Sequence, residues 1–387
     1  MRIPLLLQVV IAVALGLILG TVVPLPVVRA FLTFNGIFAE YLEFCIPLII
    51  LALVSGGISG LGTHSGKLVL ITVAIAYGST LFSGFFTYFS CQAVFPSLLN
   101  YDMTISSMSL KGIHADILPY FNINIEPLMN VMTALTLAFV IGLGIAACKA
   151  KTLLECVTES QRIIETVIQY TIIPFLPLFI FGIFLKMTAM GDAARTIAVF
   201  GKVICVIFAL HVLLLLIQYV TAGAIGRKNP FRLLWTMLPA YATALGTSSS
   251  AATIPVTLKQ TILNGVRPAI AQFCVPLCAT IHLAGSTMKI TAFAMTVVLL
   301  SGQPLNTATF AQFICLLGIT MVAAPGVPGG AIMAATAVLQ SVLGFNEQNI
   351  ALMITLYIAT DSFGTACNVC GDGAISVVVD RIAGEKE

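Results

Sequence analysis

Four polar residues recur along the last apolar segment of the chain, at spacings of four, three and four: Asp361, Thr365, Asn368 and Asp372. At about 100° per residue of an α-helix, their side chains fall within an arc of roughly 60° and form one polar stripe. A carboxylate at bilayer depth is costly unless a cation, a partner or water accompanies it. The stripe therefore predicts a cation site or path inside a membrane protein. Alternatively, the acids reach the headgroups or form a buried polar pair that only fixes packing, although roughly 16 Å of helix separates Asp361 from Asp372.

The composition of the chain indicates an integral membrane protein that crosses the bilayer several times. Hydrophobic residues make up 59% of the 387 residues and charged residues 9%, whereas roughly a quarter of a soluble domain is charged. The mean hydropathy is +1.06, and a water-facing fold could not bury so much apolar surface. We therefore expect an all-α polytopic membrane protein. The formal net charge of +3 is too small to indicate a nucleic-acid partner.

The ten cysteines lie in hydrophobic segments without histidine neighbours at zinc spacing, so we interpret them as small apolar residues. Cys367 and Cys370 form a CxxC pair, but they lie on an expected membrane helix. We therefore predict no redox or metal role for this pair.

Six membrane-spanning segments of about 20 residues are predicted in residues 1–230, near 4–23, 37–61, 68–95, 127–148, 165–188 and 196–226. The longest loop, 97–126, is expected outside. Basic residues gather in the loops of the other side, which by the positive-inside rule is the cytoplasm and holds the N-terminus. These residues are Lys67, Lys149, Lys151, Arg227, Lys228 and Arg232, whereas the outer loops carry Asp102, Asp116, Glu126 and Asp192.

Residues 231–387 contain two apolar segments that small residues and prolines interrupt midway, where a straight span should be most apolar. Backbone freed at membrane depth must be buried in protein or line a watery cavity, and a pair of such segments in inverted repeats indicates a transporter's binding site. We therefore predict two re-entrant hairpins; two kinked but complete helices are the alternative. The predicted order is hairpin 1 (232–265, interrupted at 246–250 and Pro255), a full span (268–300), hairpin 2 (308–345, interrupted at 323–330) and a last helix (348–378) that returns the C-terminus to the cytoplasm.

Four short motifs then carry a family resemblance: SSSAATIP at 248–255, ATIHLAGST at 279–287, PGVPGG at 325–330 and D-x-x-x-T-x-x-N-x-x-x-D at 361–372. In this order they resemble the first hairpin, seventh helix, second hairpin and eighth helix of the glutamate transporter family, the dicarboxylate/amino acid:cation symporters. The resemblance implies a homotrimer whose subunits have eight transmembrane helices and two re-entrant hairpins. Helices 1, 2, 4 and 5 would form the scaffold, and helices 3 and 6 would join residues 231–387 in a transport domain that moves as an elevator.

The resemblance implies a substrate site at the polar stripe. Asp361 resembles the family's acceptor for the substrate ammonium group, and Thr365 and Asn368 resemble hydrogen-bonding partners of the substrate carboxylate. The rest of the implied cradle consists of Ser249, Ser250, Ser286, Val327 and Gly329.

The resemblance also implies two sodium sites, made largely of backbone carbonyl oxygens, which hard cations prefer as ligands. The first comprises Asp372 with the carbonyl groups of Asn368 and Cys278. The second comprises the Thr280 carbonyl group and the backbone at Met321, Val322 and Ala324. Tyr77 and Thr80 match positions of the third helix that supply cation-site oxygens, or they are packing residues of an apolar helix.

One departure from the family concerns the ions. The seventh-helix motif is usually N-M-D-G-T, whereas this chain has His282 and Ala284 at the first and third positions. A third sodium site of the family type is therefore not expected. His282 could carry a proton in place of that cation, or it could be a neutral histidine that is hydrogen-bonded between the helices.

A second departure concerns the substrate. Members that take acidic amino acids usually have an arginine where this chain has Gly364, and that arginine binds the side-chain carboxylate. Together with Ala284, the D-S-x-x-T-A-x-N pattern is more similar to the bacterial serine/threonine symporters and favours a small neutral substrate. Lys289 is a counter-signal, because it could bind the carboxylate of an acidic amino acid or a dicarboxylate. Alternatively, Lys289 pairs with Asp361 or extends to the membrane surface.

The sequence as a whole predicts a secondary transporter rather than an enzyme. We expect symport of a small amino acid with sodium, or alternatively with protons, across a bacterial-type inner membrane, with no other cofactor. No nucleophile, base and oxyanion hole occur together. A channel would need a continuous polar lining, whereas the polar residues converge on one mid-depth site.

Overall fold

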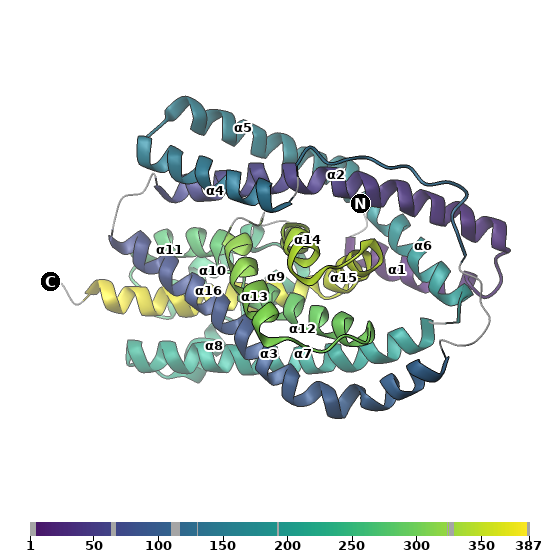
Figure 1. Ribbon diagram of the computed structural model, residues 1–387. Coiled ribbons are helices and arrows are strands. Elements are labelled where there is room, and N and C mark those ends of the chain that lie inside the picture. Colours follow the sequence, from purple (N-terminus) through teal and green to yellow (C-terminus); the bar gives the residue numbers. More distant parts are fainter. Residues whose placement is uncertain are drawn as a thin grey trace.

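The computed structural model describes residues 5–62, 67–109, 117–129, 131–191, 193–322, 324 and 329–384. Within these ranges all regular structure is helical, and Figure 1 shows two groups of helices. The all-α prediction is therefore confirmed.

The first group contains most of the N-terminal helices. These are α1 (Leu5–Leu19), α2 (Leu25–Gly62), α4 (Val131–Cys148), α5 (Lys151–Val167) with the π-helical η1 (Ile168–Ile172), and α6 (Leu176–Ala189). Helix α2 packs along α4, α5 and α6, and α1 packs on α6. Small residues allow that last contact: a Cβ atom added at Gly20 would lie 2.5 Å from the Cβ atom of Thr188.

Several predicted boundaries in this group were wrong. Helix α2 begins at Leu25, so it includes residues assigned to a loop. The predicted span 165–188 is two helical segments, Lys151–Ile172 and Leu176–Ala189, inclined by 47°. The bend contains Pro174, which cannot donate a backbone hydrogen bond.

The predicted outer loop, 97–126, is also shorter than expected, because α3 (Lys67–Ser109) extends into it and ends only at Ser109. Residues 117–129 have no regular structure and lie against α2. There the backbone N–H of Tyr120 donates to Thr33 Oγ1 at 2.9 Å, and that of Ile125 donates to Glu40 Oε2 at 2.7 Å.

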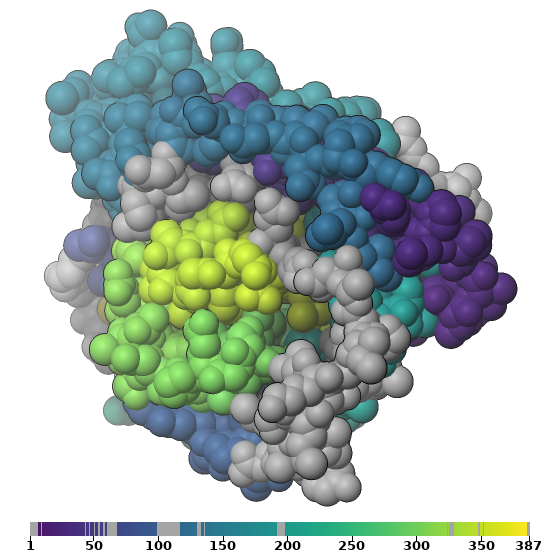
Figure 2. All heavy atoms as spheres, turned by 45° about the vertical axis from the view of Figure 1, so that its right-hand side comes forward, coloured from purple at the N-terminus to yellow at the C-terminus, as the bar shows by residue number. Residues whose placement is uncertain are grey.

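The second group surrounds α16 (Asp361–Gly384), which carries the polar stripe. Its other members are α3, α7 (Ala193–Gly226), α8 (Pro230–Thr236), α9 (Leu238–Thr247), α10 (Ser250–Leu263), α11 (Pro268–Ile281), α12 (Ala284–Leu300), α13 (Thr307–Val322), α14 (Gly330–Leu343) and α15 (Glu347–Ala359). Helix α16 contacts α3, α7, α9, α10, α11, α12 and α15. In Figure 2 the lime-coloured residues of α14 and α15 reach the surface between α4 and α13.

Each interrupted segment forms a pair of helices that pack on each other, α9 with α10 and α13 with α14. The first turn contains Ser248 in the left-handed region (φ 50°) and Ser249, whose side chain accepts from the N–H of Ala252 at 3.3 Å and caps α10. Most of the second turn, residues 325–328, lies outside the described residues.

The predicted span 268–300 and the predicted last helix 348–378 are each broken in two. Helices α11 and α12 meet at His282 (φ −106°, ψ 100°) and Leu283. Helices α15 and α16 meet at Thr360 (φ −117°, ψ 8°). Both breaks lie beside the polar stripe and free backbone groups there.

Five described segments are long and apolar enough to span a membrane: Leu25–Ile49, Leu68–Leu98, Ala198–Gly226, Pro268–Leu300 and Asp361–Gly384. The bent pair of α5 and α6 would make a sixth. Shorter apolar helices, Val10–Leu19 and Thr136–Cys148, lie in the two remaining predicted spans. The structure thus has the apolar helices of a membrane protein.

Candidate functional site

The polar stripe of α16 is buried inside the second helix group. Asp361 is 5% exposed, Thr365 6%, and Asn368 and Asp372 1% each. The alternative in which the acids reach the headgroups is therefore wrong. Thr365 bonds within its own helix, donating to the carbonyl oxygen of Asp361 at 3.0 Å.

Asn368 holds the break between α11 and α12. Its Oδ1 atom accepts from the N–H groups of Gly285 at 2.8 Å and Ser286 at 3.4 Å, which as the second and third residues of a helix lack intrahelical partners. Gly285 is required there, since an added Cβ atom would lie 2.7 Å from the carbonyl oxygen of Gly364. The close approach of α12 to α16 thus depends on this contact.

Ser286 lies at the centre of this contact. Its Oγ atom accepts from Asn368 Nδ2 at 3.1 Å and from the Tyr357 hydroxyl at 2.9 Å. Both bonds use the oxygen as acceptor, and the Ser286 hydroxyl donates to no acceptor among the described residues, so its proton is available to a carboxylate.

Replacing Tyr357 with phenylalanine is expected to lower the free energy of unfolding by about 1 kcal/mol, because it removes one buried hydrogen bond to Ser286. The loss should also reduce the stabilisation that a bound amino acid confers. Thermal unfolding in detergent, with and without serine, measures both effects. Tyr88→Phe is the matched control, because the Tyr88 hydroxyl bonds Thr307 Oγ1 at 2.8 Å away from the stripe; equal ligand effects in the two variants would contradict the prediction.

Asp361 connects α16 to α12 and α14. Its Oδ2 atom accepts from the N–H of Gly329 at 2.7 Å, and its Oδ1 atom lies 3.7 Å from Lys289 Nζ. The Lys289 ammonium group also donates to the carbonyl oxygen of Thr360 at 3.0 Å and lies 3.9 Å from the centre of the Tyr357 ring. Lys289 is 0% exposed, so it does not extend to the membrane surface.

The Lys289 stem fills the space beside Gly364. A Cβ atom added at position 364 would lie 2.4 Å from Lys289 Cε and 2.7 Å from Nζ. A larger residue at 364 would therefore displace Lys289. Glycine at 364 and lysine at 289 are sterically complementary.

His282 and Asp372 form the second buried pair. His282 Nδ1 lies 2.9 Å from Asp372 Oδ1, and His282 Nε2 lies 3.0 Å from Ser79 Oγ, which accepts from Gln218 Nε2 at 3.1 Å. With Asp372 ionised, Nδ1 carries the proton and Nε2 accepts from Ser79. Gly371 makes room for the imidazole ring, since its added Cβ atom would lie 2.4 Å from His282 Cε1.

One oxygen of Asp372 is available to a cation. Its Oδ2 atom is buried without a hydrogen-bond partner among the described residues. Within the described ranges of the chain, no three His, Cys, Asp or Glu side chains lie close enough together to hold a metal ion. A cation bound at Asp372 would therefore rely on carbonyl and hydroxyl oxygens, as sodium can.

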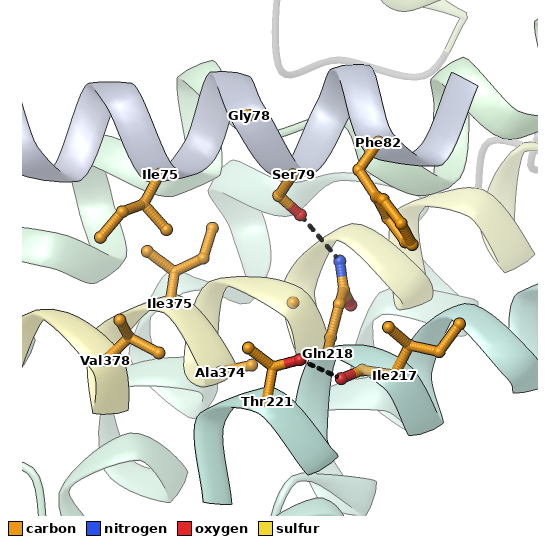
Figure 3. Close-up of a pocket in the computed structure, with 11 residues that line it drawn as sticks. Ile75, Gly78, Ser79, Phe82, Ile217, Gln218, Thr221, Ala374, Ile375 and Val378 are labelled. Carbon is orange, nitrogen blue, oxygen red and sulfur yellow. Dashed lines mark hydrogen bonds between the residues drawn. The ribbon is translucent and has the colours of Figure 1, made fainter. Parts of the chain in front are cut away.

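A crevice of about 300 Å³ lies between α3, α7 and α16 and is lined by Ser79, the hydrogen-bond partner of His282, and by Gln218. Figure 3 shows Ser79 and Gln218 pointing toward each other across it, among apolar side chains such as Ile75 and Ile375. The crevice is therefore mainly apolar, with one polar wall.

Ser79 and Gln218 were not predicted as site residues, and neither was Ser83, whose hydroxyl donates to the Ala284 carbonyl oxygen at 2.6 Å. The two residues predicted on the third helix point elsewhere: the Tyr77 hydroxyl donates to the carbonyl oxygen of Cys315 and the Thr80 hydroxyl to that of Ala76. The four-residue spacing of Ser79 and Ser83, one helix turn, was the available signal.

The remaining predicted residues lie around this centre. Ser250 is buried in the first turn of α10, beside Ser249. Cys278 is buried, and its carbonyl oxygen accepts from the N–H of His282 at 2.8 Å. Thr280 is exposed near the end of α11, Met321 and Val322 end α13, Ala324 is buried, and Val327 lies outside the described residues.

Comparison with known proteins relates the whole chain to transporters. The model of the sodium:dicarboxylate symporter family matches residues 5–382. The serine/threonine transporter SstT of Acinetobacter baumannii is 28% identical over 396 residues, which cover 98% of this chain and 97% of that protein. The neutral amino acid transporter B(0) of Homo sapiens is 30% identical over 202 residues, which cover 51% of this chain and 37% of that protein.

Proposed function

Because the chain belongs to the sodium:dicarboxylate symporter family, we propose that it couples the entry of sodium ions to the uptake of a small neutral amino acid such as serine, threonine or alanine. The observation that carries the choice of substrate is Gly364. Its space is filled by Lys289, which pairs with Asp361 inside the protein. No arginine stands at 364 to receive a side-chain carboxylate.

The substrate site of this proposal contains one anionic and one donor-rich end. Asp361 accepts the substrate's ammonium group at the anionic end. The hydroxyl proton of Ser286 supports binding of the substrate's carboxylate at the other end, with Asn368 and Thr365 as further partners. The first-turn residues Ser249 and Ser250 and the backbone at 327–329 complete the cradle.

The proposed sodium sites are those given by the family resemblance. The Asp372 Oδ2 atom, which has no hydrogen-bond partner in the part of the chain that the structure describes, supports the first site, with the carbonyl groups of Asn368 and Cys278. The second site comprises the Thr280 carbonyl group and the backbone at Met321, Val322 and Ala324. A proton role for His282 stays a prediction.

The membrane arrangement of the proposal is an elevator in a homotrimer, with eight spans and two re-entrant hairpins. In Figure 1, α2, α4 and α5 lie together along one side of the helices around α16, which supports a scaffold and a transport domain. We place the protein in a bacterial inner membrane with both termini in the cytoplasm. Its proposed partners are the amino acid, sodium, lipid and two further copies of the chain.

Serine, threonine or alanine is expected to raise the unfolding temperature of the purified protein, and only when sodium is present. A ligand at 100 times its Kd stabilises the folded state by about 2.7 kcal/mol. The measurement is thermal unfolding in sodium or choline chloride, with aspartate, glutamate and succinate as comparison ligands. If aspartate or succinate stabilised the protein and the neutral amino acids did not, the proposed substrate would be acidic and not neutral.

A further inference from the structure

The two buried carboxylates of α16 each pair with a basic residue of the segment α11–α12, one at the break between the two helices and one on α12. Asp372 pairs with His282 and Asp361 with Lys289. Each basic side chain lies against a glycine of α16, Gly371 or Gly364, where an added Cβ atom would lie 2.4 Å from it. The pairs are thus built into the crossing of these helices.

The surroundings of Lys289 Nζ are those of a binding site for an ammonium group. A carboxylate oxygen of Asp361 lies at 3.7 Å, the Thr360 carbonyl oxygen at 3.0 Å, and the centre of the Tyr357 ring at 3.9 Å. A carboxylate, a carbonyl oxygen and an aromatic face are the three groups that bind ammonium ions in proteins. Asp361 is also the carboxylate that receives the substrate ammonium group in the proposed function.

The same carboxylate holds the start of α14. Asp361 Oδ2 accepts from the N–H of Gly329, while Oδ1 faces Lys289. The helix pair α13–α14 can therefore be anchored to Asp361 while the Lys289 ammonium group neutralises the charge of the Asp361 carboxylate. Without Lys289, this anchor would be an uncompensated buried anion, which is unfavourable.

We propose that Lys289 is a tethered ammonium group that takes the place of the substrate ammonium at Asp361, so that the empty carrier closes and returns across the membrane. This inference rests on the proposed function. When substrate arrives, its ammonium group displaces Lys289 from Asp361. The bonds of Lys289 to the Thr360 carbonyl oxygen and to the Tyr357 ring do not involve the carboxylate, so they can hold the displaced charge.

The test compares two transport modes of the full-length protein in vesicles of phosphatidylethanolamine and phosphatidylglycerol. Net uptake of labelled serine into empty vesicles requires the empty carrier to return, whereas exchange against internal serine does not. In Lys289→Met, we expect the ratio of net uptake to exchange to fall at least tenfold. Lys289→Arg keeps the charge and should keep the ratio within threefold.

An unchanged ratio in Lys289→Met would overturn the inference, because the return step would then not need the charge. If the wild-type protein shows neither mode with serine, threonine or alanine, the proposed function fails instead. Lys289→Ala provides a second test: ethylammonium should raise the unfolding temperature of this substrate-free variant by at least 3 °C more than that of the wild type. An equal effect on both proteins would also overturn the inference.

Discussion

Replacing Asp361 with asparagine should reduce sodium-driven uptake of serine at least 100-fold. The change removes the charge that receives the substrate ammonium group, and it leaves Lys289 buried without its counter-ion. A 100-fold loss corresponds to about 2.7 kcal/mol of binding free energy. Removal of one partner of a buried ion pair also lowers the free energy of unfolding, by about 3–5 kcal/mol. The measurement is initial uptake of labelled serine in proteoliposomes at several serine concentrations.

Asp380→Asn is the matched control for this experiment. The Asp380 carboxylate accepts from Arg267 Nε at 2.7 Å, but this pair lies near the exposed end of α16. Partly exposed pairs contribute about 0–1 kcal/mol, so uptake should stay within threefold of wild type. Wild-type affinity for serine in Asp361→Asn would contradict the proposed role of Asp361.

The burial of the polar stripe could be predicted because helical periodicity is a local property. Asp361, Asn368 and Asp372 repeat with the helix period inside an apolar segment, and a bilayer leaves such a stripe only the protein interior. The paired helices of the interrupted segments were predictable for a similar reason. Glycine and proline break a helix through their own backbone properties, and serine does so through hydrogen bonds from its side chain to nearby backbone groups.

The breaks at His282 and Thr360 could not be predicted in this way. At the first break, the N–H of Gly285 finds its partner in Asn368, 83 residues away. Without that partner, an unbroken helix would satisfy more backbone hydrogen bonds than a broken one. The sequence also contains no proline or glycine at 282–283 that would indicate a break. Periodicity describes one helix at a time, so it does not report a bond between two helices.

The positions of the basic residues show the same limit. Lys289 was predicted to pair with Asp361, to bind a substrate carboxylate or to reach the membrane surface. The packing beside Gly364 places it next to Asp361 and away from the surface, and this packing is visible only in the folded structure. Ser79 became part of the site because α3 crosses α11–α12 at His282, 203 residues further along the chain. The spacing of Ser79 and Ser83 marks one polar face of α3, but it does not indicate which helix that face meets.

The charge of Asp372 is expected to set the sodium dependence of transport. In Asp372→Asn the side chain keeps its shape and an Oδ1 acceptor for His282 Nδ1, but it loses the negative charge that the carboxylate offers a cation at the Oδ2 position. The sodium concentration for half-maximal serine uptake should therefore rise at least tenfold, which corresponds to about 1.4 kcal/mol. Uptake at several sodium concentrations, with choline keeping the ionic strength constant, measures this shift.

Ser376→Ala separates the loss of charge from a disturbance of the helix. Ser376 is fully buried one turn from Asp372, and its hydroxyl donates to the Asp372 carbonyl oxygen at 2.8 Å. Because that bond lies within α16 and adds no charge, the sodium titration of this variant should match that of wild type. If Asp372→Asn also left the titration unchanged, Asp372 would not be a sodium ligand, and its pair with His282 would only hold α16 against the break between α11 and α12.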